Sequence, residues 1–151
     1  KLAVSTLDAM CDGYFRNVIG EIDPIPAEKV ERLVICSGKV YYDLLEARRA
    51  AEADNVVIIR LEQLYPFPEE EFAAALEPYP NLREVVWCQE EPMNQGAWYS
   101  TQHRLRRTIL ARDENLYLAY AGRDAFAAPA VGYASIHNEQ QAQLVNDALF
   151  G

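Results

Sequence analysis

Short apolar runs and amphipathic segments alternate along the chain from about residue 31 to its end. Four of the apolar runs are too short for helices and lack polar alternation, a pattern typical of strands that are buried on both faces of a sheet. These runs are residues 33–36, 56–59, 85–88 and, more weakly, 116–121. The pattern therefore predicts at least four buried strands.

The segments between these runs have the 3.6-residue periodicity of helices. Residues 40–51 place their apolar side chains on one stripe and their charged side chains opposite it. Pro68 followed by three glutamates is typical of a helix start, where proline fits the first turn and acids face the positive end of the helix dipole. We expect a third helix over about residues 98–112 and a fourth that begins at Asn138, with Gln141 in a capping-box position.

Strands that alternate with helices at this spacing predict an α/β fold, with a mostly parallel sheet covered by helices on both faces. A chain of 151 residues fits one such domain. The first two dozen residues are expected to be irregular apart from residues 15–19. Pro24 and Pro26 keep the stretch around them out of helices and central strands.

Charge narrows the functions that such a domain could have. The formal net charge is −9, and a surface of that sign repels phosphate backbones, so nucleic acid is a poor candidate partner. No apolar run approaches the roughly 20 residues that cross a bilayer, and we expect no membrane segment. The chain opens without an initiator methionine or a signal-peptide pattern, and we expect it to be a fragment of a longer protein.

The three cysteines are far apart in the sequence and form no CxxC pair for zinc or redox chemistry. Cys36 and Cys88 end apolar runs, where a free cysteine usually serves as a small core residue. This usage suits a reducing compartment, the bacterial cytoplasm or the mitochondrial matrix.

Charged side chains follow the predicted strands. In parallel sheets, ligands bind beyond the carboxyl ends of the strands, close to helix N-termini. At this edge we expect Ser37-Gly38-Lys39, residues 60–65, residues 89–96 and Gly122-Arg123-Asp124. The mixed charges predict either an anion site or a salt-bridged cluster of loops, in which Lys39 would pair with Glu90 or Glu91. The expected strand-to-helix turn that contains Lys39 has only one glycine, so the signal for nucleotide binding is weak.

Neither histidine has a partner at the spacing that metal binding or catalysis needs, and we assign no catalytic residue. The helix expected over residues 98–112 carries the one concentration of basic residues in the chain. Its four arginines form either a solvated face or a docking surface for an acidic neighbour. They are Arg104, Arg106, Arg107 and Arg112.

Four long segments, in the same order, closely resemble the end of the first-component (decarboxylase) subunits of 2-oxoglutarate dehydrogenase. They are Cys-Ser-Gly-Lys-Val-Tyr-Tyr-Asp-Leu (36–44), Arg-Leu-Glu-Gln-Leu-Tyr-Pro-Phe-Pro (60–68), Trp-Cys-Gln-Glu-Glu-Pro-Met-Asn-Gln-Gly-Ala-Trp (87–98) and Tyr-Ala-Gly-Arg-Asp-Ala-Phe-Ala-Ala-Pro-Ala-Val-Gly (120–132). The resemblance divides the chain into a linker from an upstream domain, residues 1–14, and a transketolase C-terminal-like domain, residues 15–151. It implies a three-layer α/β/α fold whose five-stranded mixed sheet has the order 1-3-2-4-5. Strand 1 is expected to be antiparallel and to lie at residues 15–19.

The resemblance also implies what the longer parent protein does. The parent would oxidatively decarboxylate 2-oxoglutarate and succinylate the lipoyl group of the dihydrolipoyl succinyltransferase core, acting as a homodimer. In this family thiamine diphosphate and Mg²⁺ are bound by the upstream domains through a Gly-Asp-Gly motif. The present chain contains no Gly-Asp pair, so no cofactor-binding residue can be carried over to it.

Similar proteins from actinobacteria use this domain in a pocket for the activator acetyl-coenzyme A. The matching positions here are Lys39 and Gln95, with Ser37 beside them. The resemblance therefore implies an effector site at Ser37, Lys39 and Gln95, within a structural and regulatory domain. The alternatives are a free-standing sensor of acetyl-coenzyme A or a nucleotide, and a protein–protein docking domain.

Overall fold

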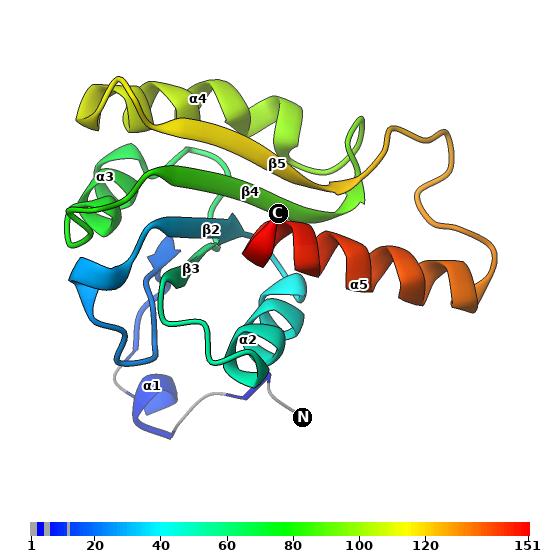
Figure 1. Ribbon diagram of the computed structural model, residues 1–151, viewed down its shortest axis with the longest axis horizontal. Coiled ribbons are helices and arrows are strands. Elements are labelled where there is room, and N and C mark those ends of the chain that lie inside the picture. Colours follow the sequence, from blue (N-terminus) through cyan, green and yellow to red (C-terminus); the bar gives the residue numbers. More distant parts are fainter. Residues whose placement is uncertain (1–2, 5–6, 12) are drawn as a thin grey trace.

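A five-stranded sheet lies between two pairs of helices in the computed structural model, which describes residues 3–4, 7–11 and 13–151 (Figure 1). The strands are β1 (Val18–Ile19), β2 (Arg32–Cys36), β3 (Val56–Leu61), β4 (Glu84–Pro92) and β5 (Tyr117–Arg123). The helices are α1 (Leu7–Cys11), α2 (Val40–Ala50), α3 (Glu69–Leu76), α4 (Trp98–Arg112) and α5 (Ala134–Phe150), with a short 3₁₀ helix at Ala27–Lys29. Among the helices described, none is long and apolar enough to cross a membrane.

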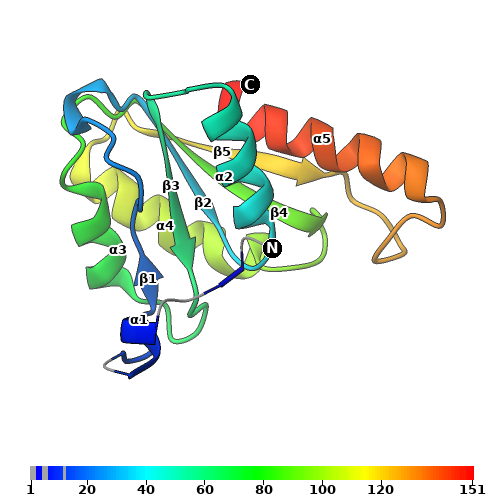
Figure 2. The same ribbon diagram turned by 90° about the horizontal axis from the view of Figure 1, so that it is seen from below.

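The strand order is β1-β3-β2-β4-β5, as the family resemblance implies. Strands β2 to β5 are parallel, and β1 pairs antiparallel with β3 through Val18 and Leu61. Helices α3 and α4 cover one face of the sheet, and α2 and α5 cover the other (Figure 2). The predicted three-layer α/β/α fold and its mixed sheet are therefore confirmed.

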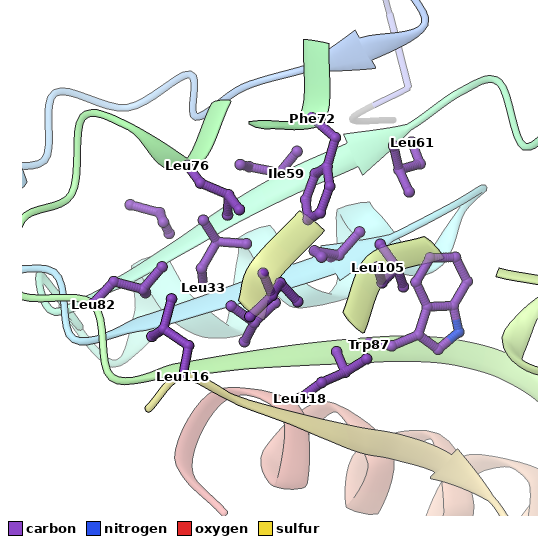
Figure 3. Packing of buried hydrophobic residues seen from close by; sticks show 14 of the residues in the cluster. Leu33, Ile59, Leu61, Phe72, Leu76, Leu82, Trp87, Leu105, Leu116 and Leu118 are labelled. Carbon is purple, nitrogen blue, oxygen red and sulfur yellow. The ribbon is translucent and has the colours of Figure 1, made fainter. Parts of the chain in front are cut away.

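Each face of the sheet has its own hydrophobic core. On one face Phe72 and Leu76 of α3 and Leu105 of α4 pack onto Leu33 and Ile59, among other side chains (Figure 3). The opposite core joins alternate residues of the same strands to α2 and α5. Six residues predicted to be buried are at most 2% exposed: Val34, Ile35, Val57, Ile58, Val85 and Val86. The two cores account for the continuous apolar runs, because neighbouring strand residues face opposite helix layers.

The predicted starts of α3 and α4 are confirmed, whereas the predicted start of the last helix is not. Helix α4 occupies the residues predicted for it, and α3 begins directly after Pro68. The predicted start of the last helix at Asn138 is wrong, because α5 begins at Ala134 and its first turn closes through the His137 N–H and the Tyr133 carbonyl. Gln141 is no capping residue, since its amide reaches α2 and β4 instead.

The N-terminal part also differs from the expectation. Strand β1 is shorter than residues 15–19, because the Asn17 carbonyl accepts the N–H groups of Glu62 and Gln63 just before the strand. Helix α1 lies where irregular structure was expected. The expected linker, residues 1–14, includes residues 1, 2, 5, 6 and 12, which lie outside the described residues.

Candidate functional site

The charged residues expected at the carboxyl edge of the sheet do gather there, and β4 contributes more than the sequence indicated. Strand β4 continues to Pro92, so Glu90 and Glu91 belong to the strand and not to the following loop. Glu90 lies between the start of α2 and the inner side of α5. The interactions of this edge are centred on its side chain and carbonyl.

Lys39 occupies the N-cap position of α2 and forms an ion pair with Glu90. Gly38 precedes it with a φ of +80°, a left-handed conformation that glycine adopts without strain, and this turn links β2 to α2. The Lys39 Nζ lies 2.5 Å from a Glu90 carboxylate oxygen and 3.6 Å from Asp43. The hydrogen bond to Glu90 is the main cause that raises the pKa of Lys39. Of the two alternatives that the sequence left open for Lys39, the structure contains the ion pair with Glu90, although 68% of the lysine side chain remains exposed.

Arg123, the last residue of β5, fastens α5 to the same edge. Its guanidinium donates to the Glu90 carbonyl, to Gln140 at 3.1 Å and to Gln141 at 2.9 Å. The Gln141 amide in turn donates to Asp43 at 2.7 Å and to the Glu90 carboxylate at 2.9 Å. A continuous polar network thus joins α2, β4, β5 and α5.

Gln95 and Ser37 lie outside this network. The Gln95 amide donates to the Phe126 carbonyl at 3.0 Å, and Asn94 bonds both backbone groups of Phe126. The loop after β4 is thereby clamped to the loop after β5. Within the described part of the chain, no hydrogen bond joins Ser37 or Gln95 to Lys39. The structure brings Lys39 together with Glu90, whereas Gln95 contacts the loop after β5.

Gln89 is a buried residue that the sequence did not single out. Its carbonyl oxygen accepts the Trp87 indole N–H and the Trp98 backbone N–H, both at 3.0 Å. Its amide nitrogen donates to the carbonyls of Glu91, Pro92 and Gln95. Every polar atom of the side chain is bonded, so Gln89 fixes the turn from β4 into α4.

Arg60, at the carboxyl end of β3, stacks its guanidinium on the Tyr41 ring, 4.3 Å from the centroid. Its Nε is buried and has no hydrogen-bond partner among the residues that the structure describes, while a Glu62 carboxylate oxygen lies 3.5 Å from it. The stacking offsets part of the cost of burying the cation. Arg60 therefore contributes positive charge to this edge without being fully paired.

A cavity of about 390 Å³ lies between the loop after β5 and α5. Arg123 and Gln140 of the polar network form one wall, and apolar side chains such as Phe126, Pro129 and Leu144 form the others. Ser37, Lys39 and Gln95 are not among the residues that line it. The expected effector residues therefore do not form this cavity, although Gln95 contacts Phe126 in its wall.

The chemistry that this edge offers is electrostatic and not nucleophilic. Burial raises the pKa of Cys36 well above its usual value and that of Cys88 to about 12, so both thiols stay protonated at neutral pH. Their burial confirms the structural interpretation of these cysteines. The described residues include no cluster of histidine, cysteine and carboxylate side chains that could hold a metal ion.

The fold and this edge define a class: a three-layer α/β domain with charged and polar side chains at the carboxyl edge of its sheet. The family model described as 2-oxoglutarate dehydrogenase C-terminal matches residues 4–149, and the chain belongs to this family.

Among its relatives are proteins named 2-oxoglutarate dehydrogenase E1 component. Those of Azotobacter vinelandii and Haemophilus influenzae are 59% and 58% identical to 98% of this chain. The protein of Coxiella burnetii is 51% identical over 99% of it. The chain spans 16% of the length of each of these relatives.

Proposed function

We propose that this chain is the C-terminal structural and regulatory domain of a succinyl-transferring 2-oxoglutarate dehydrogenase. The observation that supports the proposal is the family match over residues 4–149, together with relatives named as first components of that enzyme. The parent would oxidatively decarboxylate 2-oxoglutarate and succinylate the lipoyl group of dihydrolipoyl succinyltransferase, in the bacterial cytoplasm or the mitochondrial matrix. Thiamine diphosphate and Mg²⁺ would be bound by the upstream domains of a homodimer, and the present domain would support them.

Activity measurements on the isolated chain and on the full-length parent test this proposal. The purified chain is expected neither to bind thiamine diphosphate in calorimetry nor to reduce ferricyanide with 2-oxoglutarate. The full-length parent should do both, and should lose the reaction when residues 15–151 are removed. Oxidation by the chain alone, in a preparation free of the intact host enzyme, would contradict the proposal. Full activity of the truncated parent would contradict it too.

The regulatory part of the proposal concerns an anionic effector, acetyl-coenzyme A, at Ser37, Lys39 and Gln95. In the part of the chain that the structure describes, helix α2 begins without a side-chain cap, and the exposed Lys39 ammonium lies at this helix start. An uncapped helix start next to a cation favours an anion. Lys39 would exchange Glu90 for the ligand, and Gln95 would exchange the Phe126 carbonyl for an amide or adenine group.

The full-length parent is the protein in which to test this effector site. Lys39→Ala is expected to weaken acetyl-coenzyme A binding by about 1.5–3 kcal/mol, the value of a hydrogen bond to a charged group. Gln95→Ala should weaken it less. Lys29→Ala is the matched control, because Lys29 is an exposed lysine that pairs with Asp54 elsewhere. Unchanged acetyl-coenzyme A affinity and activation in both Lys39→Ala and Gln95→Ala would contradict the effector site. Lys39 would then serve only in its ion pair with Glu90.

A further inference from the structure

The two edges of the sheet are protected to different degrees. An edge strand exposes a row of unpaired backbone N–H and C=O groups, which proteins usually shorten, charge or cover. At one edge β1 has only two residues, and beyond it the Glu21 carboxylate accepts the Ile58 N–H at 2.9 Å. At the other edge β5 has seven residues and, in the described part of the chain, pairs only with β4 (Figure 1).

Strand β5 lacks the features that usually keep an edge from pairing. Its sequence, Tyr-Leu-Ala-Tyr-Ala-Gly-Arg, contains no proline, lysine or acid. Its one charged residue, Arg123, is the last in the strand and is bonded to β4 and α5. The irregular register between β4 and β5 falls between Cys88 and Pro92, near the end of the strand pair. Most of β5 thus keeps the regular geometry that a further strand needs.

Helix α4 lies against β5 and has positive charge without any acid in its 15 residues. Two of its four arginines are already bonded within the domain. Arg107 pairs with Glu69 of α3, and Arg112 donates to the carbonyls of Leu76 and Tyr79. Arg106 is exposed and forms no ion pair with any residue that the structure describes.

Arg106 points away from α3. Thr108 and Ala111 line the groove between α3 and α4. Two residues turn a helix by about 200°, so Arg106 projects from the side of α4 opposite to Thr108, the side of the β5 edge. Four exposed residues share this stripe at helical spacing: Tyr99, His103, Arg106 and Leu110. We call these four residues the α4 stripe.

We propose that the open edge of β5, together with the α4 stripe, binds an extended acidic segment of another polypeptide chain. The segment adds a sixth strand to the sheet, and its backbone bonds to the free groups of β5. Side chains of a strand alternate between the two faces of a sheet. Acidic residues at every second position would therefore meet Arg106 and His103 on the α4 face. This inference goes beyond the proposed function and does not rest on it.

The positive charge of Arg106 favours an acidic segment over a second copy of this chain as the occupant of the β5 edge. If β5 paired with β5 of a second copy about a two-fold axis perpendicular to the sheet, both α4 helices would stay on one face. The two Arg106 side chains would then approach each other, and like charges across an interface oppose association. An acidic segment instead neutralises this charge.

The test uses the 151-residue chain and an eight-residue synthetic peptide of alternating Glu and Val with blocked ends. Calorimetry measures binding, and amide hydrogen exchange locates it. We expect slower exchange of the Tyr117–Arg123 amides on binding, with the amides of β2 serving as an internal check of folding. Arg106→Glu should weaken binding about tenfold or more and favour the matching Lys-Val peptide. Arg83→Glu, the same charge change on an exposed arginine before β4, should leave binding unchanged.

Methylating alternate backbone nitrogens of the peptide should abolish binding, because the methyl groups remove the donors that face β5. Equal binding of the methylated peptide would overturn the proposal, as would slower exchange confined to other elements. Absence of binding at about 1 mM peptide would overturn it as well. Concentration-dependent self-association of the chain, with slower exchange in β5, would identify a second copy as the occupant and contradict the acidic segment.

Discussion

The guanidinium of Arg48 and the carboxylate of Glu21 form an ion pair that is almost fully removed from solvent. The Arg48 side chain is 2% exposed and donates to both Glu21 oxygens, one of them at 2.9 Å. Glu21 also accepts the Ile58 N–H, and Arg48 reaches Asp23 at 2.6 Å. The segment after β1 is thereby fastened to both α2 and β3, so the short edge strand is held by side chains as well as by its two-residue pairing.

Removing either partner of this pair should destabilise the domain strongly. Arg48→Ala leaves the buried Glu21 carboxylate without its cation, which costs about 3–5 kcal/mol, and Glu21→Ala should cost less because Arg48 keeps its ion pair with Asp23. Urea unfolding should show this loss, and Glu21→Leu combined with Arg48→Met should recover part of it. Lys29→Ala breaks the exposed pair with Asp54 and is the control, with an expected loss of about 0–1 kcal/mol. Single-variant losses below about 1 kcal/mol would mean that water reaches the pair.

Acid should weaken the same cluster through Asp23. Hydrogen bonding from Arg49 is the main cause that lowers the pKa of Asp23, burial opposes it, and Arg48 adds to the lowering. A carboxyl whose folded pKa is below its unfolded value, about 3.9, contributes stability above the unfolded pKa and loses it as the pH falls through the folded pKa.

We therefore expect a contribution from Asp23 that is constant between about pH 7 and 5 and declines below about pH 4. In urea unfolding at a series of pH values, Asp23→Asn should be less stable at pH 7 and lose less stability on acidification. Glu46→Gln, on the exposed side of α2, is the control for removing one carboxylate. Parallel curves for Asp23→Asn and the unmodified chain would contradict this role.

The core of the sheet gives a third prediction. Ile58 of β3 is 1% exposed and packs between the sheet and the α2/α5 layer. Ile58→Ala should cost about 2–5 kcal/mol, from the lost transfer energy and the cavity that remains. Ile136→Ala removes the same atoms at an exposed position of α5 and should cost little. A loss below about 1 kcal/mol at Ile58 would show that the surrounding side chains collapse into the space.

The fold was predictable where the pattern of apolar residues is local and strong. The runs at residues 33–36, 56–59 and 85–88 identify central strands because both faces of each strand are buried. The start of α5 was not predictable in this way, because Tyr133 carries no capping side chain and Asn138 with Gln141 has the spacing of a capping box. The strand order itself came from the family resemblance, since periodicity does not report which strands are neighbours.

The candidate site could be predicted only in outline. The rule that ligand-binding residues follow parallel strands located Lys39 and Glu90, and their pairing follows from the adjacency of β2 and β4. The bonds of Gln141 to Asp43 and Glu90 had no signal in the sequence, because these partners are 98 and 51 residues away from it. Buried polar residues such as Gln89 look like ordinary surface residues until the acceptors around them are known.

Gln89 provides the last prediction. Its amide nitrogen faces three backbone carbonyls, at 3.2, 3.2 and 3.0 Å, and its oxygen accepts N–H groups from both tryptophans. Gln89→Met removes both the donor and the acceptor of this side chain. The three carbonyls and two N–H groups then lose their partner, at a cost of about 1–3 kcal/mol in the free energy of unfolding that should not depend on pH. Gln89→Glu keeps the shape and replaces the donor with a titratable oxygen.

The carboxyl introduced by Gln89→Glu faces the lone pairs of three carbonyls in a buried site, so its pKa in the folded state should lie above the unfolded value of about 4.3. A group of this kind lowers stability as the pH rises from the unfolded to the folded pKa. Gln89→Glu should therefore be nearly as stable as the unmodified chain at about pH 4, where the protonated carboxyl can donate one bond, and clearly less stable at about pH 7. Denaturant unfolding followed by tryptophan fluorescence measures both variants, and a loss for Gln89→Glu that stays constant with pH would mean that the loop after β4 opens to water.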